Sequence, residues 1–265
     1  MNIAWNWVFV AETIVLWYIV HMKIIPNIIP MARMKLALNA LAPYKRQMEE
    51  ARKIGDNEAE REAILKCAKT WSTNVLKMFE ADVEVLGREN IPEKGPVVFV
   101  GNHQGYGDIL LCLYAFDRFQ VGFLAKSTLK KVPWYGKWIK DIRSIYIERD
   151  DSRASLKAIN EGIELLEQGF SLVVFPEGTR SKGPDIQAFR RGPLRLATKP
   201  GIPIIPFSIQ GSYRFFEEKD HVQKGVTMKM MIHPMVETKG LTKAEIRALD
   251  DQIEATVRSG MEILK

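Results

Sequence analysis

The chain has 265 residues, 46% of them hydrophobic, so it is long enough for one large domain with a well-buried core. Its 38 Lys and Arg residues outnumber 32 Asp and Glu residues, and the net charge of +6 favours anionic partners such as nucleic acid, acidic lipid headgroups or phosphorylated metabolites. Two separated cysteines and four scattered histidines argue against a disulfide framework and a metal centre, so we expect reduced thiols, no metal and no cofactor.

Residues 3–20 (IAWNWVFVAETIVLWYIV) form an apolar run about as long as a membrane span. Tryptophans and a tyrosine edge the run, as is typical of membrane interfaces. A cleaved signal peptide is not expected, because no basic residue precedes the run. An unpaired carboxylate at mid-bilayer costs on the order of 2.5 kcal/mol or more, so Glu12 favours insertion into one leaflet but leaves a full span open.

A second apolar helix is expected over residues 31–41, with Arg33 and Lys35 among its apolar positions. This pattern is typical of an interfacial helix beside anionic lipid. We predict that residues 1–43 form a membrane-associating helix pair and that the protein lies on the cytoplasmic face of the cell membrane. A buried hairpin packed on the globular domain is the alternative.

Residues 44–62 carry dense charges of both signs around Gly55, which predicts a helix, a turn and a second helix that runs to about Glu80. We therefore expect residues 44–80 to form a helical connector packed on the main domain.

From residue 81 to 265, β-branched runs alternate with helical patterns. The expected strands are residues 83–87, 96–102, 118–126, 143–149, 170–178, 202–209 and 226–234. The expected helices are residues 107–116, 133–141, 152–168, 190–199 and 242–263. This alternation predicts an α/β domain with a largely parallel central sheet flanked by helices.

Three unusual polar loops each follow a predicted strand: GNHQGYGD, IERDD and FPEGTRSKG. Ligands of open parallel sheets bind outside the carboxyl ends of the strands, so the three loops are expected to form one site. In the first loop, His103 stands five residues before Asp108, and glycines allow a tight turn that brings the two together. A histidine oriented by a carboxylate can act as a general base, whereas the simpler interpretation is a loop histidine that caps a helix.

The FPEGTRS loop offers an anion site. The planar guanidinium of Arg180 can bind two phosphate oxygens, and the backbone N–H groups of Gly178 and Thr179 can reach the same anion. Glu177 is expected to fix Arg180 or Arg149, or to accept a hydrogen bond from a glycerol hydroxyl.

Arg149 and Lys126 end two further predicted strands at the same edge of the sheet. Together with Arg180 they would suit a phosphomonoester, although each alone is more often a solvated charge.

The motifs NHQGYGD, YIERDD, FPEGTRS, AFRRG and GIPIIPFSI, in this order, resemble the 1-acylglycerol-3-phosphate acyltransferases and their glycerolipid acyltransferase relatives. The resemblance covers about residues 80–210 and implies the glycerolipid acyltransferase fold. It also implies transfer of a fatty acyl group from acyl-CoA or acyl carrier protein to the sn-2 hydroxyl of 1-acylglycerol-3-phosphate (lysophosphatidic acid), which gives phosphatidic acid for phospholipid synthesis.

The resemblance also implies a role for each matching residue. His103 corresponds to the catalytic base and Asp108 to its orienting partner. The substrate-binding positions are Arg149, Glu177, Gly178 and Arg180. Ile202 and Pro203 fall in a block associated with the acyl donor or the shape of the site. The N-terminal helix pair is similar to the membrane-docking element of bacterial members.

One departure from the family is Gly105, where members commonly have Ser. It puts the acceptor in doubt more than the reaction, so glycerol-3-phosphate or another lysophospholipid stays open. Backbone amides of residues 101–107 and the Lys126 side chain are candidate donors to the oxyanion. A lipid hydrolase and a non-catalytic membrane-surface protein are the rival classes. The chain has no G-x-S-x-G motif, which disfavours a serine hydrolase. Its cations lie in separate loops rather than in one stripe, which disfavours nucleic-acid binding.

Overall fold

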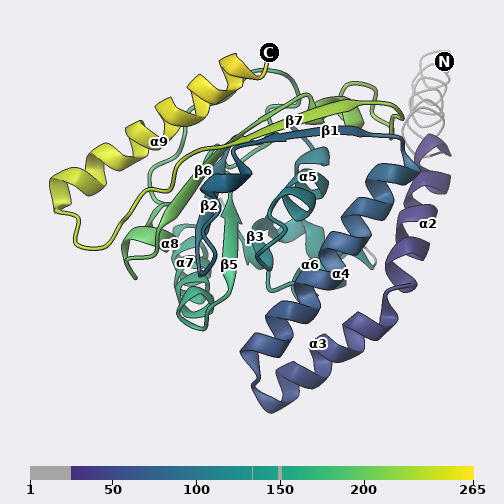
Figure 1. The fold of residues 1–265 in the computed structure, drawn as a ribbon, viewed down its shortest axis with the longest axis horizontal. Helices are drawn as coiled ribbons and strands as arrows, with labels where there is room; N and C mark the ends of the chain where they lie inside the picture. Colours follow the sequence, from purple (N-terminus) through teal and green to yellow (C-terminus); the bar gives the residue numbers. More distant parts are fainter. Residues whose placement is uncertain (1–24, 133, 149–150) are drawn as a thin grey trace, which may run out of the picture.

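A computed structural model describes residues 25–132, 134–148 and 151–265. Its centre is a seven-stranded sheet in the order β1-β7-β6-β2-β5-β3-β4 (Figure 1). The strands are β1 Asp82–Leu86, β2 Val98–Gly101, β3 Val121–Lys126, β4 Ile145–Ile147, β5 Ser171–Val174, β6 Ile204–Gln210 and β7 Thr227–Ile232. Neighbouring strands pair in parallel except β6 and β7. The predicted α/β fold with a largely parallel sheet is confirmed.

Helices cover both faces of the sheet (Figure 1). The α-helices are α2 Ile25–Asn39, α3 Ala42–Ile54, α4 Asn57–Met78, α5 Gly107–Ala115, α6 Tyr135–Asp141, α7 Ser152–Glu167, α8 Arg195–Thr198 and α9 Lys243–Ile263. Short 3₁₀ turns are η2 Arg88–Asn90, η3 Ser127–Lys131 and η4 Ser212–Phe215. Helices α4, α5 and α6 share one face, where Trp71 of α4 meets Trp138 of α6 edge to face, and α7 and α9 lie on the other.

The central strands explain why the sheet forms the core. Every residue of β2 (VFVG) and β5 (SLVV) is buried, because helices cover both of their faces. Strands buried on both faces read as continuous apolar runs, whereas β7, nearer the edge, alternates between buried and half-buried positions. Because β6, β2 and β5 are parallel neighbours in the sheet, their carboxyl ends lie side by side.

The segment predicted as a connector folds as two helices, α3 and α4, separated by Gly55 in a left-handed conformation (φ 75°). The two helices are tied to the domain by Glu60, whose side chain is fully buried. Arg52 and Arg143 both donate to Glu60, at 2.6 Å for the shortest contact of each. The connector is thus joined to the loop before β4 by a buried ion-paired cluster.

Within the described residues helix α2 spans Ile25–Asn39, so it includes residues before the predicted start at 31 and runs through Pro30. One of its faces, with Met34 and Leu38, packs on the domain. Of the helices in the described ranges, none combines the length and apolarity that crossing a bilayer requires. The apolar run of residues 3–20 lies outside the described residues, so the helix pair over residues 1–43 stays a prediction.

Candidate active site

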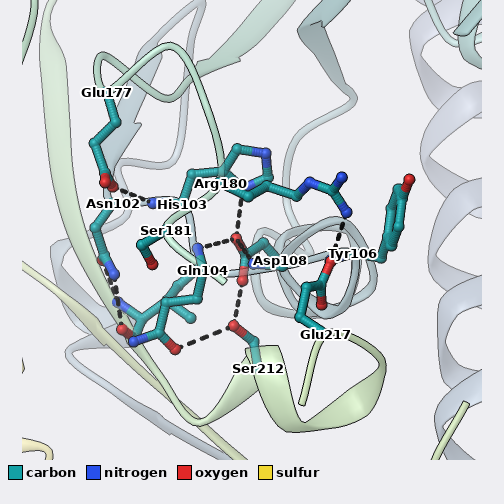
Figure 2. A network of polar contacts seen from close by, with 12 residues as sticks. Asn102, His103, Gln104, Tyr106, Asp108, Glu177, Arg180, Ser181, Ser212 and Glu217 are labelled. Carbon is teal, nitrogen blue, oxygen red and sulfur yellow. Dashed lines mark hydrogen bonds and ion pairs between the residues drawn. The ribbon is translucent and has the colours of Figure 1, made fainter. Parts of the chain in front are cut away.

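The site lies where the loops after β2, β5 and β6 meet (Figure 2). Asn102 joins the first and third of these segments: its side-chain amide donates to the Ile209 carbonyl (2.9 Å), and its side-chain oxygen accepts from the Ile209 N–H (2.7 Å). This side chain extends the pairing of β2 with β6 by one step, so the loop that begins at His103 starts from a fixed point.

His103 and Asp108 are in contact, as the sequence predicts. Nδ1 of His103 lies 2.6 Å from Oδ2 of Asp108, and the imidazole stacks on the ring of Phe175 with centroids 4.1 Å apart. Asp108 is fully buried in the first turn of α5, whereas the His103 side chain is 15% exposed. The histidine therefore connects a buried carboxylate to the open part of the site.

The environment of Asp108 fixes which ring nitrogen of His103 carries the proton. Oδ2 also accepts hydrogen bonds from the N–H groups of Gln104 (2.7 Å) and Gly105 (3.0 Å), and Oδ1 accepts one from the Ser212 hydroxyl. A carboxylate surrounded by donors acts as an acceptor, so Nδ1 of His103 carries the proton. No described residue bonds Nε2, which leaves this nitrogen free to take a proton.

Glu177 holds the backbone of the site. Its two oxygens accept from the N–H of His103 (2.6 Å) and the N–H of Gln187 (2.8 Å), and the residue is 2% exposed. Burial raises the pKa of Glu177 to about 7, against the two backbone N–H groups that lower it. The expected contact with Arg180 is not among those of the described residues, since Arg180 pairs with another acid.

The FPEGTRS loop lies directly against the histidine loop. The N–H of Ser181 donates to the His103 carbonyl (2.8 Å), and the N–H of Lys182 donates to the Gln104 carbonyl (3.0 Å). This short stretch of pairing places Arg180 beside the dyad (Figure 2).

Arg180 is held by two residues that sequence reasoning missed as its partners. Its Nη1 lies 2.6 Å from Oε1 of Glu217, and its guanidinium carbon lies 3.9 Å from the centre of the Tyr106 ring. Ser212, which holds Asp108, was also missed. Ser212 follows the end of β6, so the rule that sites form at the carboxyl ends of strands could have found it. Nothing in the sequence pattern marks Glu217.

The other predicted residues are placed differently. Gly178 adopts a left-handed conformation (φ 73°), Thr179 is exposed, and Lys126 ends β3 with an exposed side chain at the same edge of the sheet. Arg149 lies outside the described residues. Ile202 and Pro203 precede β6, at the end of the strand opposite Gln210, which accepts from Gln104.

The structure therefore does not bring Ile202 and Pro203 to the dyad. The length of β6 separates the two groups by roughly 20 Å at about 3.3 Å per residue.

Two cavities adjoin the site. The first, about 260 Å³, is apolar and lies between α2, α4, α5 and η4, with Met31, Trp71, Leu110 and Phe215 in its walls and Tyr106 at its boundary. Tyr106 therefore contacts both this cavity and the Arg180 guanidinium.

The second cavity, about 400 Å³, lies at the carboxyl ends of β3, β4 and β5. Phe175, which stacks on His103, belongs to its wall, and three exposed arginines line it: Arg190, Arg191 and Arg195. Through Phe175, His103 thus adjoins the basic cavity, and through Tyr106, Arg180 adjoins the apolar cavity.

Comparisons with known proteins agree with this arrangement. The acyltransferase family profile matches residues 82–210. The 1-acyl-sn-glycerol-3-phosphate acyltransferase of Borreliella burgdorferi is 30% identical over 181 residues, which are 68% of this chain and 72% of that protein. The enzyme of the same name from Pseudomonas aeruginosa is 29% identical over 192 residues, 72% of each chain.

Among solved structures, the crystal structure of the 1-acyl-sn-glycerophosphate (LPA) acyltransferase PlsC from Thermotoga maritima superposes with a TM-score of 0.68 at 28% identity. The match covers 88% of this chain and 95% of that one. The fold, the order of the motifs and these matches lead to one conclusion: the chain is an acyltransferase that belongs to the family of the 1-acyl-sn-glycerol-3-phosphate acyltransferases.

Proposed function

We propose that the protein transfers a fatty acyl group from a thioester, acyl-CoA or acyl carrier protein, to the sn-2 hydroxyl of 1-acylglycerol-3-phosphate, which gives phosphatidic acid. The observation that carries this proposal is the His103–Asp108 pair with a free Nε2 beside Arg180, together with an apolar cavity lined by Tyr106, which stacks on Arg180, and a basic cavity lined by Phe175, which stacks on His103. The names of the relatives support the same acceptor.

In the proposed reaction, Nε2 of His103 takes the proton of the acceptor hydroxyl while the hydroxyl oxygen attacks the thioester carbonyl. The carbon–sulfur bond then breaks, and the leaving thiolate receives the proton from the imidazolium. Asp108 stabilises the imidazolium between the two steps.

The oxyanion needs a donor that the protein does not already use. The N–H groups of residues 103–106 donate to Glu177, Asp108 and Glu217, so these four amides are occupied. The sequence offers two candidate donors to the oxyanion, the amides of residues 101–107 and the Lys126 side chain. Because four of these amides are occupied, the exposed Lys126 side chain is favoured over this part of the loop.

The transferred acyl chain is proposed to lie in the apolar cavity, because each methylene buried there contributes about 0.8 kcal/mol. Tryptophan in place of Met31, which lines the cavity from α2, is expected to shift the donor preference toward shorter chains. Initial rates with a series of acyl-CoA chain lengths measure the shift. The control is Leu36→Trp, on the exposed side of the same helix (66% exposed). An equal shift in both variants, or none with Met31→Trp, would contradict this placement.

The phosphate groups of the donor are proposed to bind at the arginine-lined cavity, so that the thioester spans His103 between the two cavities. Charge-assisted hydrogen bonds contribute about 1.5 kcal/mol or more, close to a factor of ten in affinity. Joint Arg190→Glu and Arg195→Glu substitutions are therefore expected to raise KM for acyl-CoA about tenfold or more without changing KM for the acceptor. Lys157→Glu with Lys243→Glu, at exposed helical positions outside the cavity, is the control for net charge. A rise in the acceptor KM instead would place the acceptor phosphate there.

Membrane association is proposed from helix α2. Its outer side exposes large apolar residues, Ile28 at 56% and Ile29 at 69%, next to the exposed cations Arg33 and Lys35. An apolar face bordered by basic residues suits the interface of an anionic bilayer, in keeping with an enzyme on the cytoplasmic face whose acceptor is a lipid.

The test of the proposed function is thiol release by the purified protein in detergent micelles, with acyl-CoA or acyl carrier protein as donor. Lysophosphatidic acid, glycerol-3-phosphate and lysophosphatidylcholine are offered in separate reactions. Release that requires lysophosphatidic acid and yields phosphatidic acid supports the proposal. Release without an acceptor would identify a thioesterase, and release with glycerol-3-phosphate alone would reassign the acceptor.

A further inference from the structure

A buried acid stands behind the arginine that faces the substrate. Oε1 of Glu217 accepts from Nη1 of Arg180 (2.6 Å) and from the N–H of Tyr106 (3.0 Å), as Figure 2 shows for the ion pair. The Glu217 side chain is 3% exposed, against 27% for Arg180. Within this ion pair, the Glu217 carboxylate is therefore buried, whereas the Arg180 side chain is partly accessible to a ligand.

Glu217 fills the space beside position 105, where this chain departs from the family. A Cβ atom on Gly105 would lie 2.2 Å from Oε2 and 2.8 Å from Cδ of Glu217, distances that real Cβ atoms do not show. A serine at this position, as is common in the family, would require the Glu217 carboxylate to shift. Gly105 and Glu217 are thus complementary parts of one arrangement.

The arrangement is costly for the folded protein. Oε2 of Glu217 is buried without a hydrogen-bond partner among the described residues. A buried polar atom that makes no hydrogen bond lowers the stability of the folded protein. Burial raises the pKa of Glu217 to about 7, although the Arg180 charge and the Tyr106 N–H oppose the shift. A buried acid that is retained at such a cost is a candidate for a functional role.

The contacts of Arg180 leave one edge of its guanidinium free. The Tyr106 ring covers one face of the guanidinium and Glu217 occupies Nη1, whereas no described residue bonds Nε or Nη2. Two neighbouring N–H groups on one edge are the arrangement that binds two oxygens of a phosphate.

We propose that Glu217 is the positioning residue of Arg180: it fixes the guanidinium so that the free Nε–Nη2 edge meets the phosphate of the acceptor, and Gly105 provides the space that the acid requires. The inference rests on the proposed function, since it assumes a phosphorylated acceptor.

The test compares KM with kcat in the Glu217→Gln variant, which keeps the shape of the side chain and removes its charge. KM for lysophosphatidic acid is expected to rise about tenfold, because the substrate loses roughly one charge-assisted contact. The value of kcat should stay within about twofold of the wild type, and KM for acyl-CoA should be unchanged. Gly105→Ser is expected to give a similar rise because it displaces the carboxylate. Added to Glu217→Ala, Gly105→Ser should cause little further rise, since both changes act through the same position.

The pH profile separates positioning from a merely structural role. The charged groups that face Glu217 are Arg180 from the loop after β5 and Asp108 from α5, with the N–H of Tyr106. Glu217 is ionised above its raised pKa of about 7 and loses its charge as the pH falls through that value. KM of the wild type should therefore rise as the pH falls below about 7, beyond the change that the ionisation of the substrate phosphate causes in every variant. In Glu217→Gln, this additional rise should be absent.

The outcomes separate the inference from the proposed function. Wild-type activity with lysophosphatidic acid and an unchanged KM in Glu217→Gln would overturn the inference alone. If kcat and the melting temperature both fall while KM for the acceptor is unchanged, Glu217 has a structural role. This result would also overturn the inference. A wild-type protein that binds and acylates no phosphorylated acceptor would overturn the proposed function, and the inference with it.

Discussion

Alanine in place of His103 is expected to lower kcat for acyl transfer by about 10²- to 10⁴-fold, the range that a positioned general base contributes. The variant retains Asp108, Arg180 and both cavities, so KM for each substrate should change little. Steady-state thiol release with saturating lysophosphatidic acid measures the effect. The physical reason is that no other described side chain offers a free acceptor nitrogen where Nε2 lies.

The matched control is His221→Ala. His221 lies after η4, its ring contacts the Lys219 carbonyl, and among the described residues it makes no hydrogen bond with His103 or Asp108, so this substitution should leave kcat unchanged. The His103 ring stacks on Phe175, and its loss is expected to lower stability by only about 1 kcal/mol. A His103→Ala enzyme that keeps more than a tenth of the wild-type rate, with a normal melting temperature, would rule out His103 as the base.

The parts of the site that could be predicted from the sequence depend on short-range patterns. The strands of the sheet are apolar runs bounded by turn residues, and those buried on both faces carry a strong signal. His103 stands five positions before Asp108, and the N–H groups of Gln104 and Gly105 between them donate to the same carboxylate, so local geometry alone brings the pair together. The parallel arrangement then places the FPEGTRS loop beside this pair.

The parts that could not be predicted depend on choices among distant partners. Arg180 pairs with Glu217, 37 residues away, rather than with Glu177 three residues before it, because Glu177 is engaged by two backbone N–H groups. Sequence spacing does not indicate which acid is already occupied. Helix α2 was predicted too short for a related reason: Pro30 normally ends a helix, and its tolerance here depends on the packing of the α2 face that carries Met34 and Leu38 against the domain.

The departure at position 105 shows how the two kinds of information combine. From the sequence, Gly105 indicates only that a family hydroxyl is missing. In the structure, the same glycine is the space that the Glu217 carboxylate fills. In this chain the carboxylate of Glu217, from the segment that follows η4, therefore lies beside position 105, and Asp108 still accepts from Gln104, Gly105 and Ser212.

Asparagine at position 108 is expected to reduce kcat by roughly 10²- to 10⁴-fold while the protein stays folded. The Oδ2 position accepts three N–H groups, from His103, Gln104 and Gly105, so the asparagine must place its oxygen there and turn its amide toward the hydroxyl of Ser212, which can accept. The histidine then keeps its orientation but loses the negative charge that stabilises the imidazolium during transfer.

Alanine at position 108 would be a poorer test, because it would leave buried N–H groups unpaired at about 1–3 kcal/mol each and lower activity through unfolding. Asp117→Asn is the control, since within the described part of the chain that carboxylate pairs with Lys69 and Arg88 at the surface, at 3.5 and 3.6 Å. The measurement is kcat together with the melting temperature, repeated in the His103→Ala background. If Asp108 acts through His103, Asp108→Asn should have almost no further effect there, because residues that act as one catalytic unit are not additive. A large additional loss would instead show that Asp108 supports the reaction by a route that does not pass through the imidazole.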